Sequence, residues 1–278
     1  MQRTIFKSLV IICLYTLTQY SIAAPDWEVV ELQHKARKGS LSAQFDLAGR
    51  YYTGNGVKQN YTQALKWFEK AAVKDDAIAL LNLGLMYQQG QGAAVDYVKA
   101  RYYLQKSVDQ GEREAMRALA YLYEEGMGGG KDIPKAISLL EKSAELGSND
   151  ARLKLGFLYD QGREVKQDYQ KAFYWYKQAA ENGEAIAKYN LGVMYQDGMG
   201  LEKNPEISNQ WYLAAAKQGN KDAQLNLGLN ACYGKNGFSP NRAKAQQWLQ
   251  QAADQGDSDA QKLVKELQRN IKLCTDQP

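Results

Sequence analysis

Pairs of glycines separated by one residue are the first features of this sequence whose type and spacing could bind a ligand. They occur at Gly54 and Gly56, Gly90 and Gly92, Gly126 and Gly128, and Gly198 and Gly200. A G-x-G motif cradles phosphate when it follows a strand and opens a helix. Here the residues before the glycines have helical periodicity, so the negative end of a helix would point at the ligand. The pairs therefore predict helix ends, and no cofactor is expected.

Other reactive side chains are sparse. His34 is the single histidine, and it is expected on the surface. One histidine and distant cysteines do not make a zinc site. No serine is followed by a lysine three residues later, the spacing that β-lactam hydrolysis uses, and Glu124 and Glu125 are expected to be solvated. We therefore expect no catalytic residue and no metal, and a cell-wall or β-lactam hydrolase remains the less favoured alternative.

Residues 1–23 have the layout of a secretory signal peptide. Arg3 and Lys7 precede an apolar run over 9–14, and Ser21 and Ala23 are the small residues that a signal peptidase requires. A lipoprotein anchor at Cys13 is disfavoured by the bulky Ile12 before it. Loss of Arg3 and Lys7, with no acidic residue in the segment, lowers the formal charge from +4 to +2. We expect a periplasmic protein with no nucleic-acid partner and, lacking a later run of ~20 apolar residues, no stable membrane insertion.

One unit of about 36 residues is repeated six times. Its markers are Ala43, Ala79, Ala115, Ala151, Ala187 and Ala223. A leucine follows each marker by four residues, a tyrosine by eight in the first five units, and a glycine by eleven, which describes one face of a helix ended by glycine. An Asn or Asp six residues after that glycine, one later in the sixth unit, predicts the N-cap of a second helix.

The second helix of the unit carries early alanines, tryptophans and small pairs. Neither helix can bury its apolar face alone, so the units must stack. These patterns predict an all-α solenoid of helix-turn-helix repeats. The expected boundaries are a capping helix at 24–39, repeats at 40–75, 76–111, 112–147, 148–183, 184–219 and 220–256 within 40–259, and a capping helix with a tail at 257–278.

The fourth unit, ARLKLGFLYDQGREVKQDYQKAFYWYKQAAENG from Ala151 to Gly183, shows the pattern most fully. It resembles the Sel-one-like repeat (SLR) family, a relative of the tetratricopeptide repeat. The resemblance implies a right-handed α/α superhelix and a non-enzymatic role as an adaptor or regulator that binds a protein or peptide. An immunity or inhibitor protein that neutralises a secreted effector is the alternative.

Two cysteines remain after removal of the signal segment, Cys232 and Cys274. An even pair in an oxidising compartment is compatible with a disulfide. From the sequence, a bonded pair and two free thiols are equally open.

If the helices are arranged as in tetratricopeptide arrays, the first helix of each unit lines a groove. The groove-facing candidates are Phe45, Tyr52, Leu85, Arg117, Tyr121, Lys154, Phe157, Tyr189, Asn190 and Val193. Apolar anchors flanked by amides are typical of peptide recognition, and we expect Tyr121, Phe157 and Tyr189 to make the central contact. The competing interpretation is that these residues are ordinary core packing.

Overall fold

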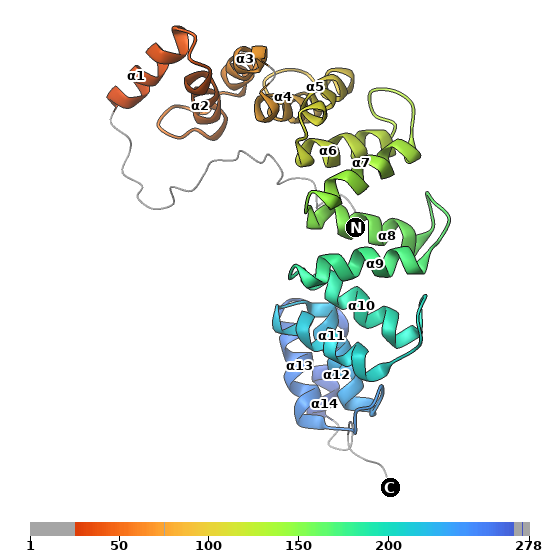
Figure 1. Cartoon of the computed structure of the whole chain (residues 1–278). Helices are drawn as coiled ribbons and strands as arrows, with labels where there is room; N and C mark the ends of the chain where they lie inside the picture. Colours follow the sequence, from red (N-terminus) through yellow and green to blue (C-terminus); the bar gives the residue numbers. More distant parts are fainter. Residues whose placement is uncertain (1–25, 75, 270–273, 275–278) are drawn as a thin grey trace. The chain divides into compact units, whose positions relative to one another are not determined.

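The computed structural model describes residues 26–74, 76–269 and 274, and every regular element among them is a helix (Figure 1). The all-α prediction is therefore confirmed. The predicted signal peptide at 1–23 lies outside the described residues, as does most of the tail after Arg269. None of the helices in the described part of the chain is both long and apolar enough to cross a bilayer. The chain divides into two compact units, Met1–Ser148 and Asn149–Pro278, which are described separately below.

The first unit contains seven α-helices and one short 3₁₀ turn among its described residues. They are α1 (Asp26–Arg37), α2 (Leu41–Thr53), α3 (Tyr61–Ala71), η1 (Ala72–Lys74), α4 (Ala77–Gln89), α5 (Tyr97–Asp109), α6 (Arg113–Glu124) and α7 (Ile133–Glu145). The helices α2, α4 and α6 open the first three repeats and are called A-type, and the helices that follow them are called B-type. Each A-type helix packs mainly against the B-type helix that follows it.

The second unit repeats this arrangement. Its described helices are α8 (Asn149–Gln161), α9 (Tyr169–Glu181), α10 (Ala185–Asp197), α11 (Pro205–Lys217), α12 (Lys221–Tyr233), α13 (Arg242–Asp254) and α14 (Ser258–Arg269). The A-type helices are α8, α10 and α12, and α14 packs on α13 at the end.

His34 lies in α1 of the first unit and is exposed, as the sequence predicts.

The turn between the two helices of a repeat is fixed by the same hydrogen bonds each time. In the first repeat the Asn60 side chain accepts a bond from the Gln63 N–H, and the Asn60 N–H donates to the Tyr51 carbonyl. The equivalent caps are Asp96, Asp132, Asp168, Asn204 and Asn241. The predicted N-caps are thus confirmed, including the cap displaced by one residue in the sixth repeat.

The second glycine of a G-x-G pair has a packing role. Gly90 ends α4 in the left-handed conformation, with φ 69°. Gly92 also has a positive φ, and a Cβ there would stand 2.3 Å from the Tyr61 carbonyl oxygen at the start of α3. The pair therefore stops one helix and lets the following loop pass against the preceding repeat.

The third repeat departs from the expected helix end. Glu125, in the right-handed region, caps α6, so the last helical residue is Glu124, two residues before Gly126. Arg101 of α5 donates to the Leu122 and Gly130 carbonyls at 2.9 and 3.1 Å and lies over the Tyr123 ring. An arginine of the preceding repeat thereby holds this glycine-rich loop in place.

Small residues on the A-type helices allow close helix approach. A Cβ at Gly192 of α10 would stand 2.5 Å from Tyr212 of α11, and Gly156 has the same relation to Tyr176. In two other repeats a leucine takes the place of the tyrosine, with Leu104 against Gly84 and Leu249 against Gly228. Tyr176 and Tyr212 are among the largest fully buried side chains among the described residues.

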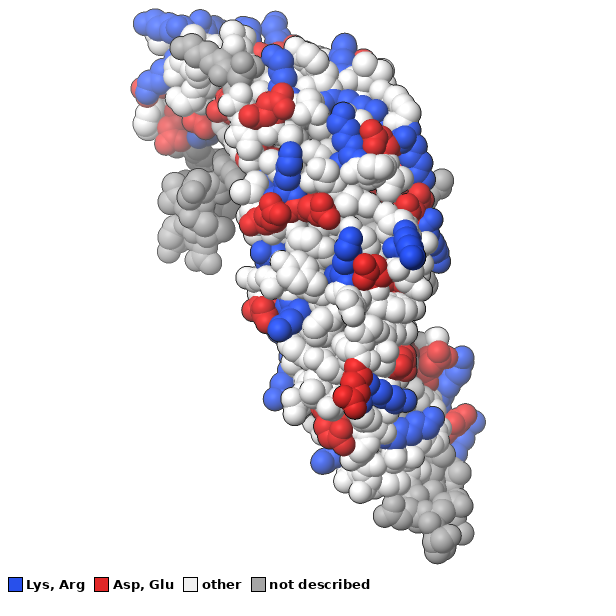
Figure 2. Space-filling view, turned by 45° about the vertical axis from the view of Figure 1, so that its right-hand side comes forward, with Lys and Arg blue, Asp and Glu red and all other residues white. Residues whose placement is uncertain are grey.

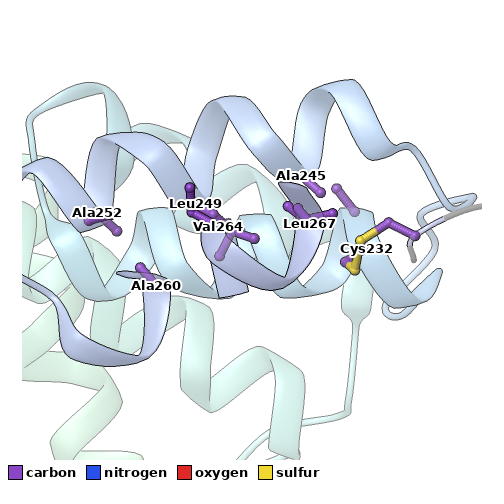
Figure 3. Close-up of a cluster of buried hydrophobic side chains, with 10 residues drawn as sticks. Cys232, Ala245, Leu249, Ala252, Ala260, Val264 and Leu267 are labelled. Carbon is purple, nitrogen blue, oxygen red and sulfur yellow. A yellow bond between two sulfur atoms is a disulfide. The ribbon is translucent and has the colours of Figure 1, made fainter. Parts of the chain in front are cut away.

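The C-terminal end is closed by a buried apolar cluster and a disulfide (Figure 3). The cluster is formed by Ala231, Cys232, Ala245, Leu249, Ala252, Ala253, Ala260, Val264, Leu267 and Cys274. Cys232 on α12 is bonded to Cys274, 42 positions later in the sequence, and both are buried. The bond ties the segment after α14 back to the last repeat.

The extra residue of the sixth repeat is absorbed in the loop after α12. Asn236 adopts a positive φ of 53°. Its side-chain amide donates to Gln196 Oε1 at 3.0 Å and to Asn230 Oδ1 at 3.1 Å, and the Asn209 amide donates to the Asn236 carbonyl. The loop is therefore held by side-chain amides from α10, α11 and α12.

Candidate interaction surface

Three of the predicted groove residues meet in one pocket of the first unit. Leu85 of α4 and Arg117 and Tyr121 of α6 line a pocket of about 160 Å³. The other lining residues are Leu81, Gln88, Gln89, Tyr97, Glu114, Ala118 and Met127. The first unit thus has a concave site built by two neighbouring A-type helices.

The size of this α4–α6 pocket limits what it can hold. Sites for small organic ligands enclose roughly 300–1,000 Å³, and this pocket encloses about half of the lower value. Among its lining side chains are no serine, cysteine or histidine that could act as a nucleophile with its base. The pocket suits one inserted side chain better than a cofactor or a substrate.

The polar groups of the pocket are partly buried. Gln88 Oε1 is buried and has no hydrogen-bond partner. Burial, followed by the charges of Glu125, Tyr97 and Glu124, raises the pKa of Tyr121. Tyr121 therefore stays protonated at neutral pH, and its ring lies in a field made more negative by the carboxylates at the end of α6.

Two carboxyl groups share the beginning of α6. Glu112 is the N-cap and accepts a long hydrogen bond, 3.4 Å, from the Glu114 N–H, and Arg113 Nε lies 2.7 Å from Glu114 Oε1. Burial and a side-chain hydrogen bond with Glu114 raise the pKa of Glu112 to about 7. Burial also acts to raise the pKa of Glu114, but its hydrogen bonds with Glu112 and Arg113 outweigh that and lower it. One proton is therefore held between the two carboxyl groups until pH approaches 7.

Substitution of Glu112 by glutamine should change how stability depends on pH. The pKa of this carboxyl group rises from 4.5 in the unfolded chain to about 7 in the folded chain. The free energy of unfolding of the protein therefore falls as pH increases through that window. Between pH 5 and pH 8 the free energy of unfolding of the wild type should fall by about 1 kcal/mol more than that of Glu112→Gln, after allowance for solvent screening. Urea unfolding at the two pH values measures the difference. Parallel pH slopes for both proteins would contradict the shared proton, and Glu181→Gln on α9 provides an exposed control.

Phe45 and Tyr52, also predicted for the groove, lie elsewhere in the first unit. Phe45 packs edge-on against the buried Phe68, with ring centroids 5.6 Å apart, and lines a second pocket of about 380 Å³ between α1 and α2. The Tyr52 hydroxyl donates to Gln91 Oε1 at 2.9 Å, in the loop after α4. Tyr52 therefore links two repeats.

The remaining predicted residues lie on α8 and α10 of the second unit. Phe157 is 39% exposed, and Lys154 and Asn190 are half-buried. Tyr189 packs on Tyr212 at 5.7 Å, and both Tyr189 and Val193 contact the buried cluster of α11 and α12. Of these five side chains, Phe157 offers the most apolar surface to a partner.

Sequence reasoning did not select Tyr97, Glu114 or Met127. Tyr97 begins a B-type helix, Met127 lies in the loop after α6, and Glu114 precedes the marker alanine of its repeat. The spacing within A-type helices carries no information on residues that loops and helix ends bring to the same pocket.

The Sel1 repeat model matches six consecutive segments of the chain. They are residues 41–76, 77–112, 113–148, 149–184, 185–220 and 221–257. The chain belongs to the Sel1-repeat family. Sel1-repeat proteins are protein-interaction scaffolds and are generally not enzymes. No curated protein matches the sequence.

Two solved Sel1-type structures are similar over most of this chain. One is c5321, a protective antigen of uropathogenic Escherichia coli with an SLR fold, at 33% identity and a TM-score of 0.78. The match covers 87% of this chain and 52% of the other, so this Sel1-repeat chain spans about half the length of that protein. The other is a Sel1 repeat protein from Oxalobacter formigenes, at 31% identity and a TM-score of 0.67, covering 81% and 99% of the two chains.

Proposed function

We propose that this Sel1-repeat protein is a periplasmic scaffold that holds a segment of a partner protein against its A-type helices, without covalent chemistry. The observation that carries this proposal is the α4–α6 pocket, where Leu85, Arg117 and Tyr121 from two repeats meet. Apolar side chains flanked by amides, an arginine and a tyrosine are typical of protein-recognition sites.

Two features support a location outside the cytoplasm. The first is the secretory pattern of residues 1–23, with its basic start, apolar run and small residues before Ala24. The second is the disulfide between Cys232 and Cys274, since such bonds persist in oxidising compartments such as the bacterial periplasm. The two similar structures described above are both of bacterial proteins.

The charge distribution supports a protein partner. On the face shown in Figure 2, basic and acidic side chains alternate in small groups separated by uncharged surface. A nucleic-acid interface would require basic residues clustered on one face. A surface of mixed sign instead favours a partner with its own pattern of charged and neutral groups.

A paired substitution in the pocket tests the proposal. Tagged protein carrying Arg117→Ala and Tyr121→Ala, expressed with its leader, should retain less than about a tenth of the partner that the wild type captures from its own envelope fraction. The control, Tyr102→Ala with Lys142→Ala, removes an aromatic and a basic residue from exposed positions of the same unit and should capture normally.

Equal capture by both double variants, with unchanged helical content and unfolding midpoint, would show that the pocket is not the binding site. If the captured partner is a secreted effector that is inactive while bound, the immunity or inhibitor role follows.

A further inference from the structure

We propose that Asn55 is a modification site, where the folded protein spontaneously loses the side-chain amide and acquires an aspartate or an isoaspartate. Asn55 lies in the loop between the two helices of the first repeat, and it lines the pocket between α1 and α2. The reaction needs no reagent other than water. It is independent of the binding of a partner protein.

An asparagine followed by a glycine favours loss of the amide, because glycine has no side chain to shield its own backbone nitrogen. The chain contains this dipeptide three times, at positions 55–56, 182–183 and 236–237. The reacting atoms are the same at all three places. Differences in rate between them in the folded protein must therefore come from the structure around each one.

The reaction joins two neighbouring residues. The Gly56 nitrogen attacks Cγ of Asn55, and the bond between Cγ and the side-chain nitrogen breaks. The proton of the Gly56 N–H passes through water to the departing nitrogen, which leaves as ammonia. Water then opens the cyclic imide at either carbonyl and gives aspartate or isoaspartate, so no atom is oxidised or reduced. Both the attacking nitrogen and the side-chain amide must be free to approach each other.

The fold leaves both groups free at Asn55. The residue is exposed, and no hydrogen bond joins its side chain to another of the described residues. Its own N–H has only a long bond of 3.3 Å to the neighbouring Thr53 hydroxyl. The Gly56 N–H makes no backbone hydrogen bond within the described part of the chain. Nothing in this loop therefore restrains the attack.

Asn182 is also exposed, but hydrogen bonds restrain both of its reacting groups. Its side-chain amide donates to the Gln178 carbonyl at 2.7 Å, and the Gly183 N–H donates to the Ala180 carbonyl at 3.0 Å. These bonds belong to the end of α9. The attack there requires that the last turn open first, which lowers the rate.

Asn236 is restrained by side chains around the loop after α12. Its amide donates to Gln196 Oε1 at 3.0 Å and to Asn230 Oδ1 at 3.1 Å. A carboxylate has no N–H to donate. Conversion of Asn236 would therefore place an acceptor against two other acceptors, and the fold opposes it.

Conversion of Asn55 changes the charge of the α1–α2 pocket. The charged side chains that line this pocket are Glu28, Glu31, Asp46, Lys35 and Arg50. Three acids against two bases give −1, and a carboxylate at position 55 makes this −2. The new charge lies in the same pocket as Arg50, which is 3.7 Å from Glu28 and thereby links α2 to α1. The converted protein should separate from the original by ion exchange.

The three dipeptides provide an internal comparison. The mature chain, with its disulfide intact, is incubated at mildly alkaline pH, and peptide mapping by mass spectrometry follows all three asparagines in one sample. Conversion at Asn55 should be at least about tenfold faster than at Asn182 or Asn236, because only the latter two require local opening. In urea with the disulfide reduced, the three rates should agree within about threefold, since the restraints of the fold are gone.

Matched variants connect the site to the change in charge. Asn55→Gln should abolish the acidic species that appears first on ion exchange, whereas Asn182→Gln, at an exposed position with the same following residue, should leave it unchanged. Equal rates at the three sites in the folded protein would overturn the assignment. So would faster conversion at Asn182 or Asn236, or an Asn55 that stays intact.

Discussion

Replacing Tyr212 by alanine is expected to lower the free energy of unfolding by about 3–5 kcal/mol. The side chain is fully buried on α11 and packs against Gly192 of α10, which has no side chain with which to fill the space. Tyr189 lies against the same ring. Urea unfolding followed by circular dichroism measures the loss.

Two further substitutions at Tyr212 distinguish the contribution of side-chain volume to stability from that of the hydroxyl hydrogen bond. Tyr212→Phe removes only the hydroxyl that donates to Gln196 Oε1 at 3.3 Å, and it should cost less than about 1.5 kcal/mol. Tyr212→Leu should be intermediate, because Leu104 and Leu249 occupy this position against Gly84 and Gly228. If the alanine variant were as stable as the phenylalanine variant, the ring would not be holding α10 and α11 together.

Removal of the disulfide is expected to cost about 3–4 kcal/mol. The bond joins residues 42 positions apart and closes a loop that contains α13 and α14. Without it, the unfolded chain gains the freedom of that loop, and Cys274 no longer completes the apolar cluster around Val264 and Leu267. The double variant Cys232→Ala with Cys274→Ala should show this loss in urea unfolding.

The effect should be local as well as large. Amide hydrogen exchange should accelerate in α13 and α14 of the double variant and remain unchanged in α10. Reduction of the wild type should reproduce both results. Equal unfolding midpoints for the oxidised and reduced wild type would show that the C-terminal helix is held by apolar packing alone.

Much of the fold was predictable because the same local signals occur six times. The tyrosine, the glycine and the Asn or Asp cap recur at fixed spacing, and Asn241 was identified as a cap although it is one residue late. Contacts between repeats left no such signal. The approach of Gly92 to Tyr61 and the bonds of Arg101 to the next loop join residues about 20 to 30 positions apart, and they depend on how helices pack.

The candidate site was predictable only in part, for the same reason. Helical spacing selected Leu85, Arg117 and Tyr121, which line the pocket, Leu85 as a buried residue and the other two half-buried. It selected Tyr189 and Val193 by the same rule, yet these two contact the core. The position of a residue on a helix face defines the direction of its side chain, whereas its burial depends on the side chains that pack against it, which for Tyr189 include Tyr212.

The loop of the sixth repeat shows where a Sel1-repeat sequence can change length. The added residue lies between Gly234, which ends α12, and Asn241, which begins α13, while the bond from the Asn241 N–H to the Ala231 carbonyl is kept. Both helices retain the 13 residues of their counterparts in the fifth repeat. Insertions and engineered tags are therefore best placed at this turn, and alignments of one repeat with another should open their gaps there and keep the helices intact.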